Sequence, residues 1–270
     1  MLGAIIGDIV GSKYEFNNIK TKEFPLFSEG CSFTDDTLLT IAVADWLLDG
    51  TSDLTEKLVS YTREYPHLSY GQRYRRWAFG SDHRPYNSYG NGAAMRVAPV
   101  LWFAQSPEEA KDLARASAEV THNHPEGIKG AQATALAGWL GGDGFSPEDI
   151  RDIITGEFGY DLTKTVDEIR EDYAFDETCQ GTVPQAIICA LEATDFEDAI
   201  RNAISIGGDS DTVAAITGGV AEAMFPIPHD IAREAMAYLP DDFEEVLRRG
   251  AIAVQCAQLP GQTACALVVH

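Results

Sequence analysis

Two short acidic stretches, each followed by an apolar run, hold the residues of this sequence that are best suited to chemistry. The first is Thr34-Asp35-Asp36 in "FTDDTLLTIAVADWLLDG", and the second is Asp209-Ser210-Asp211-Thr212 in "GGDSDTVAAITGG". In each stretch a loop is expected to become a helix, where a single Asp is enough to cap the free backbone amides. Two carboxylates with a hydroxyl exceed that need, and no Lys or Arg is near in sequence to neutralise them.

The acidic residues of both stretches are of the type that binds a hard metal ion. Carboxylates about 4 Å apart repel by ~1 kcal/mol in water and by several times more when partly desolvated. A divalent cation offsets this repulsion, and Mg²⁺ prefers oxygen ligands such as those of Asp and Thr. Four aspartates shared by two loops are enough for two ions about 3.5–4 Å apart. Either stretch alone is more simply a helix cap, whereas the two together favour a metal site.

Three other segments carry groups that suit a site beside such metals. Glu15 follows the glycine-punctuated start "MLGAIIGDIVGS", whose glycines suit a tightly packed helix, and it is a candidate general base. The stretch "RPYNSYGNGAAMR" combines aromatic residues with glycines that let backbone N–H groups approach a ligand, although an ordinary turn fits equally well. His122 and His124 are candidates for hydrogen bonds to a ligand, and a packed structural His is an equally good reading.

The elements that must position these residues are predicted to be helices. Hydrophobic periodicity is helical almost throughout and predicts roughly a dozen helices in an all-α domain. Ser106-Pro107-Glu108 and Ser146-Pro147-Glu148 are typical helix starts, and Ser52 is the expected cap of the helix that closes before Pro66. The best strand candidate is the terminal "TACALVVH". Further helices are expected at about 37–49, 127–140, 183–193, 196–206, 212–224, 228–238 and 241–249.

Composition bounds the class of protein and its partners. A chain of 270 residues with 45% hydrophobic residues, and without a Gly/Ser/Pro linker, predicts one domain over 1–270. The 42 acidic residues against 20 basic ones give a net charge of −22, which opposes binding to nucleic acid backbones and anionic membranes. A small anionic ligand stays compatible with this charge where local cations cover it.

Cysteine usage and the N-terminus indicate the compartment. The five cysteines are scattered and show no CxxC spacing, which argues against a disulfide framework or a zinc site. The N-terminus has no basic segment before its apolar start, and no run approaches the ~18 apolar residues of a membrane span. We therefore expect a cytoplasmic protein without a signal peptide.

In order and together, these motifs resemble the ADP-ribosylglycohydrolases, the family of dinitrogenase-reductase-activating glycohydrolase and of the ADP-ribosylhydrolases that act on arginine and serine. The matching motifs are the opening "GD…GS…E", "FTDDT", "SYGNGAAMR", the "TH" loop and "GGDSDT", and the resemblance runs to about residue 250. It implies an all-α orthogonal multi-helix fold with a central cleft that holds two Mg²⁺, or Mn²⁺ in some members. Residues 251–270 form a tail that the family pattern does not assign.

The resemblance also implies roles for individual residues. Glu15 matches a mobile acidic residue near the metals, and His122 matches a His at the ligand cleft. Asp36 and Glu15, followed by Asp35, are the acid/base candidates. The implied metal ligands are Thr34, Asp35, Asp36, Asp209, Asp211 and Thr212, and the implied ADP-ribose-binding loop is Ser88, Tyr89, Gly90, Asn91 and Gly92.

The implied reaction is hydrolysis of the bond between ADP-ribose and a modified protein side chain, with water activated at C1″ of the ribose. The arginine linkage is the first expectation, and serine-linked and O-acetyl-ADP-ribose stay open. One alternative is an all-α metal-dependent phosphohydrolase, because "PHD" at Pro228–Asp230 supplies a His-Asp dyad. Another is a non-catalytic ADP-ribose binder. The expected partner is ADP-ribose or an ADP-ribosylated protein, and the sequence indicates no oligomeric state.

Overall fold

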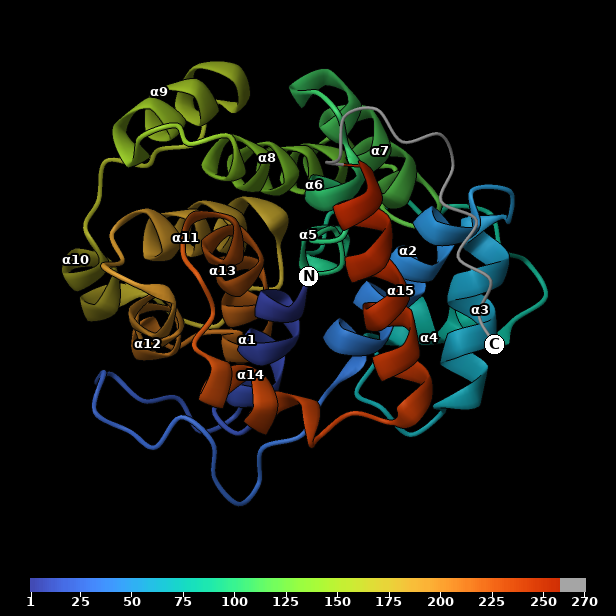
Figure 1. The fold of residues 1–270 in the computed structure, drawn as a ribbon, viewed down its shortest axis with the longest axis horizontal. Helices are drawn as coiled ribbons and strands as arrows, with labels where there is room; N and C mark the ends of the chain where they lie inside the picture. Colours follow the sequence, from blue (N-terminus) through green and yellow to red (C-terminus); the bar gives the residue numbers. More distant parts are fainter. Residues whose placement is uncertain (258–270) are drawn as a thin grey trace.

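The structure, a computed structural model, describes residues 1–257, and in that part of the chain every regular element is a helix (Figure 1). This confirms the all-α prediction, while the strand predicted in "TACALVVH" lies outside the described residues. Short helices such as α4, α5, α6 and α10 raise the number above a dozen, because they have too few turns for a periodic pattern. The helices are α1 Leu2–Ser12, α2 Asp35–Asp49, α3 Leu54–Glu64, α4 Gln72–Phe79, α5 Gly92–Met95, α6 Val100–Phe103, α7 Pro107–Glu119, α8 Pro125–Gly142, α9 Pro147–Phe158, α10 Val166–Asp172, α11 Cys179–Leu191, α12 Phe196–Ile206, α13 Ser210–Met224, α14 His229–Met236 and α15 Asp241–Ala257.

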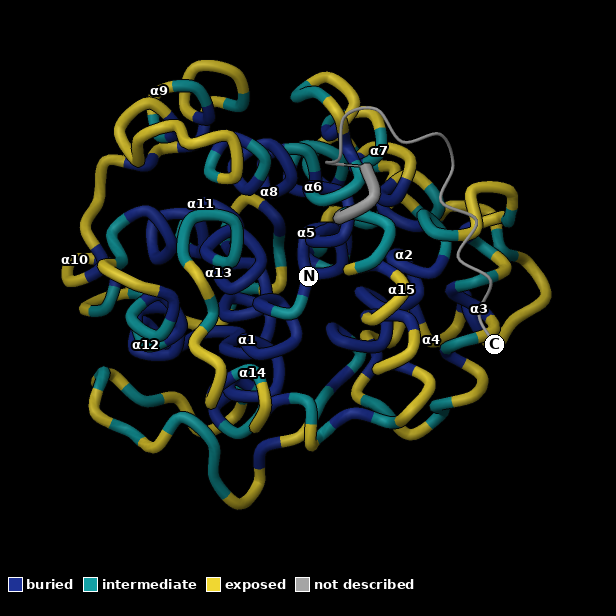
Figure 2. The backbone as a smooth tube through the Cα atoms, in the orientation of Figure 1, coloured by how far each residue is buried: buried dark blue, intermediate teal, exposed yellow. Residues whose placement is uncertain are grey.

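The centre of the molecule is the close contact between α1 and α13. Glycines at positions 3, 7 and 11 place no side chain on one face of α1, so its backbone lies directly against α13. A Cβ atom added to Gly7 would be 2.0 Å from the carbonyl oxygen of Ala214, and one added to Gly11 would be 2.4 Å from Cα of Asp211. Figure 2 shows both helices buried along most of their length. The glycine pattern of the first helix therefore predicts its tight packing correctly.

Buried apolar side chains from α1 through α15 form one contiguous core around this pair. α2 contributes a run of buried residues from Asp36 to Asp45, and α11 buries Cys179 and most of the helix that follows it. These two central helices are therefore covered on nearly all faces, whereas the peripheral helices, such as α3, bury a single stripe.

Side chains cap several outer helices as the sequence predicts. The hydroxyls of Ser106 and Ser146 each accept a hydrogen bond of 3.1 Å from the backbone N–H three residues later. The predicted cap at Ser52 is wrong, because the carboxylate of Asp53 caps α3 by accepting from Thr55 N–H at 2.6 Å. Asp53 occupies the last non-helical position, and Asp is as good a cap as Ser.

Helix boundaries shift where a cap lies ahead of the apolar pattern. The helix predicted at 183–193 begins at Cys179, because the Thr178 hydroxyl caps it. α2 begins at Asp35 and α13 at Ser210, each two residues before the predicted start. α15 continues beyond the predicted end at 249 as far as Ala257, so the unassigned tail begins inside a helix.

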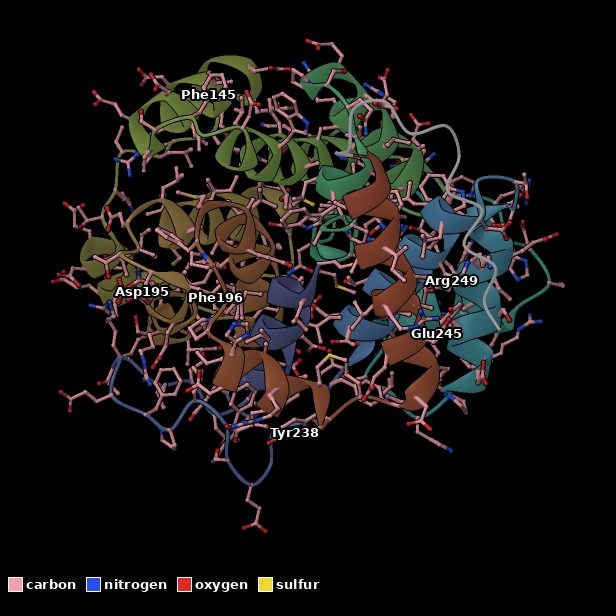
Figure 3. All side chains as sticks on the ribbon, viewed as in Figure 1. Phe145, Asp195, Phe196, Tyr238, Glu245 and Arg249 are labelled. Carbon is pink, nitrogen blue, oxygen red and sulfur yellow. The ribbon has the colours of Figure 1, made fainter. Side chains whose placement is uncertain are left out.

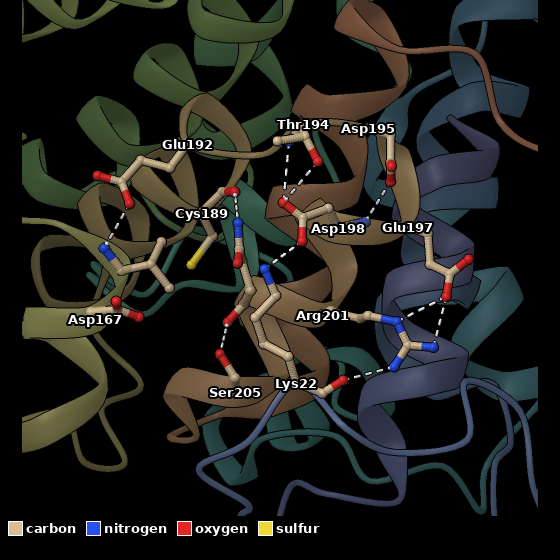
Figure 4. Close-up of polar contacts among 12 residues, drawn as sticks. Lys22, Asp167, Cys189, Glu192, Thr194, Asp195, Glu197, Asp198, Arg201 and Ser205 are labelled. Atoms are coloured by element: carbon tan, nitrogen blue, oxygen red, sulfur yellow. Dashed lines mark hydrogen bonds and ion pairs between the residues drawn. The ribbon is translucent and has the colours of Figure 1, made fainter.

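The long segment 13–33 between α1 and α2 is fastened to α12 (Figure 4). Lys22 forms an ion pair with Asp198, and the Arg201 guanidinium donates to the carbonyls of Lys22 and Phe24 at 2.8 Å each. These contacts hold a segment that has no regular structure of its own. Glu15 lies in the same segment.

The C-terminal helices close the other side of the core. In Figure 3, Arg249 of α15 lies over the blue helices, where its guanidinium is 3.3 Å from the Asp45 carboxylate of α2. Tyr238, which follows α14, stacks on Phe27 with ring centroids 5.8 Å apart. Among the described helices, none combines the length and apolar character needed to cross a membrane.

Candidate active site

Five acidic side chains from three helices and their flanking loops converge at the centre of the molecule. Carboxylate oxygens of Asp8, Asp36 and Asp211 lie within 4.8 Å of one another, and so do those of Glu15, Asp209 and Asp211. Asp211 belongs to both groups, so the two groups share a corner. The two acidic stretches, far apart in the chain, are therefore brought together as the sequence analysis expects.

Asp8 links α1 to the start of α2. Its carboxylate accepts from the backbone N–H of Thr34 at 2.8 Å, from the Thr34 hydroxyl at 2.7 Å and from the backbone N–H of Thr37 at 3.1 Å. The Thr34 hydroxyl in turn accepts from Asp36 N–H, which caps α2. Asp8 thus satisfies amides at a helix N-terminus and fixes the loop that carries Asp35 and Asp36.

The second acidic stretch is shaped by two glycines. Gly207 and Gly208 have φ values of 70° and 80°, a left-handed conformation that lets the chain turn from α12 into α13. Asp209 occupies the N-cap position of α13, but its side chain makes no capping hydrogen bond. It accepts instead from the Asn91 side-chain amide at 2.7 Å. Asp209 therefore does not cap its own helix, and it lines the cleft.

Asn18 sets the loop that carries Glu15 against the same turn. Its side-chain amide donates to the carbonyls of Glu15 at 3.1 Å and Gly208 at 2.9 Å, and its side-chain oxygen accepts from Gly208 N–H at 2.9 Å. This bridge spans the two ends of the acidic cluster. It explains how a residue outside any helix is held close to Asp209 and Asp211.

Burial and mutual repulsion raise the pKa of these carboxyl groups. Burial, followed by repulsion from neighbouring aspartates, holds the pKa of Asp36 and Asp211 well above the usual range. The same causes, burial first, raise the pKa of Glu15 to about 7 and that of Asp35 to about 7. Within the described residues, no Lys or Arg forms an ion pair with any of them.

The donor set fits a hard metal ion. The Oδ1 atom of Asp36 is buried and has no hydrogen-bond partner within the described part of the chain. A buried carboxylate oxygen without a partner is costly unless a cation contacts it. Clustered oxygen ligands without nitrogen or sulfur are those that Mg²⁺, Mn²⁺ and Ca²⁺ prefer. The buried acidic residues can therefore hold metal ions.

A cleft of about 550 Å³ opens over this cluster. Besides the carboxylates it exposes aromatic and basic side chains, so that an anionic ligand would meet cations although the protein is strongly acidic. Its lining includes Glu15, Asp35, Asp36, Tyr70, Arg73, Arg76, Tyr86, Ser88, Gly90, Asn91, Gly92, Arg96, His122, Phe175, Glu177, Asp209, Asp211 and Thr212.

Most of the predicted ligand-binding loop lies at this cleft. Ser88, Gly90, Asn91 and Gly92 line it, and a Cβ atom at Gly92 would be 3.1 Å from Nε2 of His122. The Tyr89 side chain is outside the lining. Its ring is 46% exposed and packs edge-on against His124 at 5.3 Å, so it lies at the outer surface of the loop. His124 itself caps α8.

His122 is held in its neutral form. Burial, followed by the positive charge of Arg96, pushes its pKa well below the usual value. Its Nδ1 atom shares a hydrogen bond of 2.7 Å with the Thr121 hydroxyl, which also accepts from the Arg96 guanidinium at 2.9 Å. The remaining ring nitrogen, Nε2, lies against Gly92 and is the one available to a ligand.

Comparison with known proteins identifies the family of this chain. The family model described as ADP-ribosylglycohydrolase matches residues 1–260. The chain belongs to the ADP-ribosylglycohydrolase family. Membership places it among hydrolases that act on ADP-ribose and confirms the family resemblance of the sequence motifs.

Characterised relatives cover most of the chain at low identity. The human ADP-ribosylhydrolase ARH3 is 25% identical over 83% of this chain and 84% of its own length. The ADP-ribosylarginine hydrolase Tri1 of Serratia proteamaculans is 27% identical over 83% of this chain and 70% of its own length. A solved structure of an ADP-ribosylglycohydrolase-related protein complex matches with a TM-score of 0.70, 25% identity, and coverage of 96% of this chain and 97% of that one.

Several residues of the ADP-ribosylglycohydrolase cleft were missed by sequence reasoning. Asp8 is part of the opening motif, and its position inside an apolar helix is the one signal in the sequence of a buried polar role. Glu177 and the arginines at 73, 76 and 96 also line the cleft, and no local pattern assigned them. The His229-Asp230 dyad begins α14 and does not line the cleft.

Proposed function

We propose that this protein is a divalent-metal-dependent ADP-ribosylhydrolase that removes ADP-ribose from modified protein side chains, with the arginine linkage as first substrate. The observation that carries the proposal is the cluster of unneutralised carboxylates at the floor of a cleft whose other residues include the glycine loop and His122. The name of the bacterial relative, an ADP-ribosylarginine hydrolase, supports the arginine linkage. Serine-linked and O-acetyl-ADP-ribose are the next candidates.

The proposed metal ligands are the residues of the two acidic stretches. Asp35, Asp36, Asp209 and Asp211 supply carboxylates, and Thr34 and Thr212 supply hydroxyls, for two Mg²⁺ or Mn²⁺ ions. Asp8 stands behind them as the acceptor that fixes the Thr34 loop. When bound, the ions neutralise the cluster and lower the pKa of a coordinated water.

Glu15 and Asp36 are the proposed acid/base groups, with Asp35 next. A general base works best when its pKa lies near the working pH, and the pKa of Glu15 is raised to about 7 by burial and neighbouring aspartates. Glu15 is half-buried at the cleft, so it can receive a proton from the attacking water and return it to the leaving group. Positive charge develops at C1″ of the ribose as the bond between the ribose and the modified side chain breaks. Nearby carboxylates stabilise this charge.

The proposed ADP-ribose-binding residues are Ser88, Tyr89, Gly90, Asn91, Gly92 and His122. Gly90 and Gly92 have no side chain between the backbone and the cleft, which allows close approach of a diphosphate. The neutral His122 offers Nε2 to a ribose or phosphate oxygen. In a protein of net charge −22, positive charge for the diphosphate would come from the bound metal ions.

A linkage-resolved hydrolysis panel tests this proposal. Peptides with ADP-ribose on arginine or on serine, and O-acetyl-ADP-ribose, are incubated with the protein in Mg²⁺, in Mn²⁺ and in EDTA. We expect release of ADP-ribose from the arginine peptide in either metal and none in EDTA. Asp36→Ala and Asp209→Ala should abolish turnover, whereas the exposed Asp230→Ala, outside the cleft, should retain it.

Three results would contradict the proposal in different ways. Full turnover in EDTA, or in Asp209→Ala, would refute the metal assignment. Tight binding of ADP-ribose without any product would indicate a non-catalytic binder. Release of phosphate from nucleotides, lost in Asp230→Ala, would support the phosphohydrolase alternative.

A further inference from the structure

The arginines of this protein gather in one part of the chain. Residues 63–96 contain six arginines and two acidic residues, Glu64 and Asp82, which gives this segment a charge of +4 within a chain of −22. The segment is therefore opposite in sign to the chain as a whole. Where these arginines lie relative to the cleft is therefore informative.

Three of them line a second groove of about 540 Å³ that adjoins the cleft. α4 carries Arg73 and Arg76, three residues apart and so on one helix face. Both arginines and Tyr86 line the groove and the cleft, so the two cavities share a wall. The remaining lining residues of the groove are Trp77, Asp82, Arg84 and Pro85.

The positive charge of this groove is largely unneutralised. The Arg73 guanidinium lies 5.1 Å from the Tyr86 ring, and Arg76 Nε donates to the Gln72 carbonyl at 3.2 Å. Neither arginine has a carboxylate within ion-pair distance among the described residues. Only Arg84 has one, Asp82, which leaves three arginines against one aspartate and a groove charge of +2.

The groove also has an apolar wall. Pro85 and the Tyr86 ring form part of its lining, and Trp77 lies against it. Guanidinium groups beside aromatic rings are well suited to carboxylates carried on a peptide backbone.

We propose that this groove binds an acidic segment of the ADP-ribosylated protein substrate. This segment lies next to the modified residue in the substrate chain, where that chain leaves the cleft. The inference rests on the proposed function, because only a protein substrate continues beyond the cleft. A peptide with a few carboxylates matches a groove of charge +2. A nucleic acid, whose charge extends far beyond the groove, would meet the repulsion of the acidic surface around it.

Binding of a fluorescein-labelled, unmodified glutamate-rich peptide, measured by anisotropy at low ionic strength, tests the groove without any need for hydrolysis. Arg84→Glu should weaken binding about tenfold, which corresponds to ~1.4 kcal/mol. Asp82→Asn removes the one competing carboxylate and should tighten binding about threefold. Both side chains are exposed, so opposite shifts in these two variants would not arise from misfolding.

The matched control is Arg233→Glu on α14, which changes the net charge by the same amount at an exposed position outside both cavities. The affinity of this variant for the peptide should stay within about twofold of that of the wild-type protein. Equal weakening by Arg84→Glu and Arg233→Glu would overturn the inference, because it would reduce the effect to net charge. The inference would also be overturned if the wild-type protein did not bind the peptide. Tighter binding of a single-stranded oligonucleotide of equal charge would overturn it as well.

Hydrolysis supplies an independent second readout. Two peptides carry the same ADP-ribosylated arginine, one with flanking glutamates and one with flanking serines. We expect Arg84→Glu to raise KM about tenfold for the acidic peptide alone, with kcat unchanged. Equal KM values of the wild-type protein for both peptides would overturn the inference and leave the proposed function standing. Absence of turnover with both peptides would count against the proposed function.

Discussion

The contact between α1 and α13 can be tested by adding a single methyl group at Gly7. The new Cβ atom would be 2.0 Å from the Ala214 carbonyl oxygen, 2.3 Å from its carbonyl carbon and 2.7 Å from the Ala215 nitrogen. All three are backbone atoms of α13, so no side chain can rotate away. Because a carbon–oxygen contact needs about 3.3 Å, the two helices must separate locally by roughly 1 Å.

Two effects of opposite sign decide the size of the change. Replacing Gly by Ala inside a helix is worth about 0.5–1 kcal/mol in favour of folding. Overpacking a filled interior costs about 1–3 kcal/mol, and at Gly7 the obstruction is rigid backbone, which favours the upper end. We expect Gly7→Ala to lower the free energy of unfolding by about 1–2 kcal/mol net, combining these two ranges.

The separation should impair the site more than it impairs the fold. Asp8 is the next residue after Gly7, and its carboxylate lies with those of Asp36 and Asp211 in the acidic cluster. A displacement of about 1 Å in a catalytic arrangement can cost about 100-fold in rate. We therefore expect a loss of ADP-ribose release well beyond what the fraction of unfolded protein explains.

Gly156→Ala is the matched control for this experiment. Gly156 lies in α9, is exposed, and has no atom within 4 Å of an added Cβ. The same substitution there should raise the free energy of unfolding by about 0.5–1 kcal/mol and leave activity unchanged. Urea denaturation and hydrolysis rates of both variants provide the comparison. If Gly7→Ala were as stable and active as Gly156→Ala, the argument from close helix packing would be wrong.

Three further predictions concern the acidic cluster. Because the pKa values of Glu15 and Asp35 are raised to about 7, the folded metal-free protein binds protons more tightly than the unfolded chain. The stability that these protons contribute is complete below about pH 4 and is lost as the pH rises through about 7. Denaturation in EDTA should show that loss, and saturating Mg²⁺ should reverse it. Asp36→Asn should raise the unfolding free energy in EDTA yet abolish the stabilisation by Mg²⁺, and an unchanged Mg²⁺ response would argue against Asp36 as a ligand. Asn18→Ala removes both hydrogen bonds to Gly208 and should cost about 1–3 kcal/mol and lower kcat, whereas unchanged kcat would show that Glu15 needs no such support.

Much of this architecture could be predicted from local sequence patterns. Caps such as Ser106 and Ser146 are read correctly because a cap, a proline and first-turn acids lie next to one another in the chain. The glycines of α1 predict close packing because nothing but a neighbouring backbone makes use of a bare helix face. α4 escaped prediction because "QRYRRWAF" is short and mostly polar, so its helical face has little apolar signal.

What could not be predicted depends on contacts between distant segments. The residue types of the two acidic stretches favour a metal site, whereas the individual ligand roles proposed for Asp36 and Asp211 come from the family resemblance. The role of Asp8 follows from its hydrogen bonds to Thr34 and Thr37, which exist only because α1 lies against the start of α2. The groove beside the cleft likewise depends on how α4 packs next to residues 82–86. Local patterns contain no information about such a shared wall.

The energetics of the cluster explain why helix ends alone do not account for it. Asp36 and Asp211 lie in the first turns of α2 and α13, where the helix dipole stabilises a negative charge by about 0.3–1 kcal/mol. Two charges about 5 Å apart repel by roughly 3 kcal/mol at an effective dielectric constant of about 20. Each added carboxylate increases the number of repelling pairs, so the repulsion between carboxylates exceeds the stabilisation by the helix dipoles. Protons or divalent cations must supply the balance, and the two compete for the same oxygens. This competition requires that the affinity of the protein for Mg²⁺ increase with pH, and calorimetry at several pH values measures that increase.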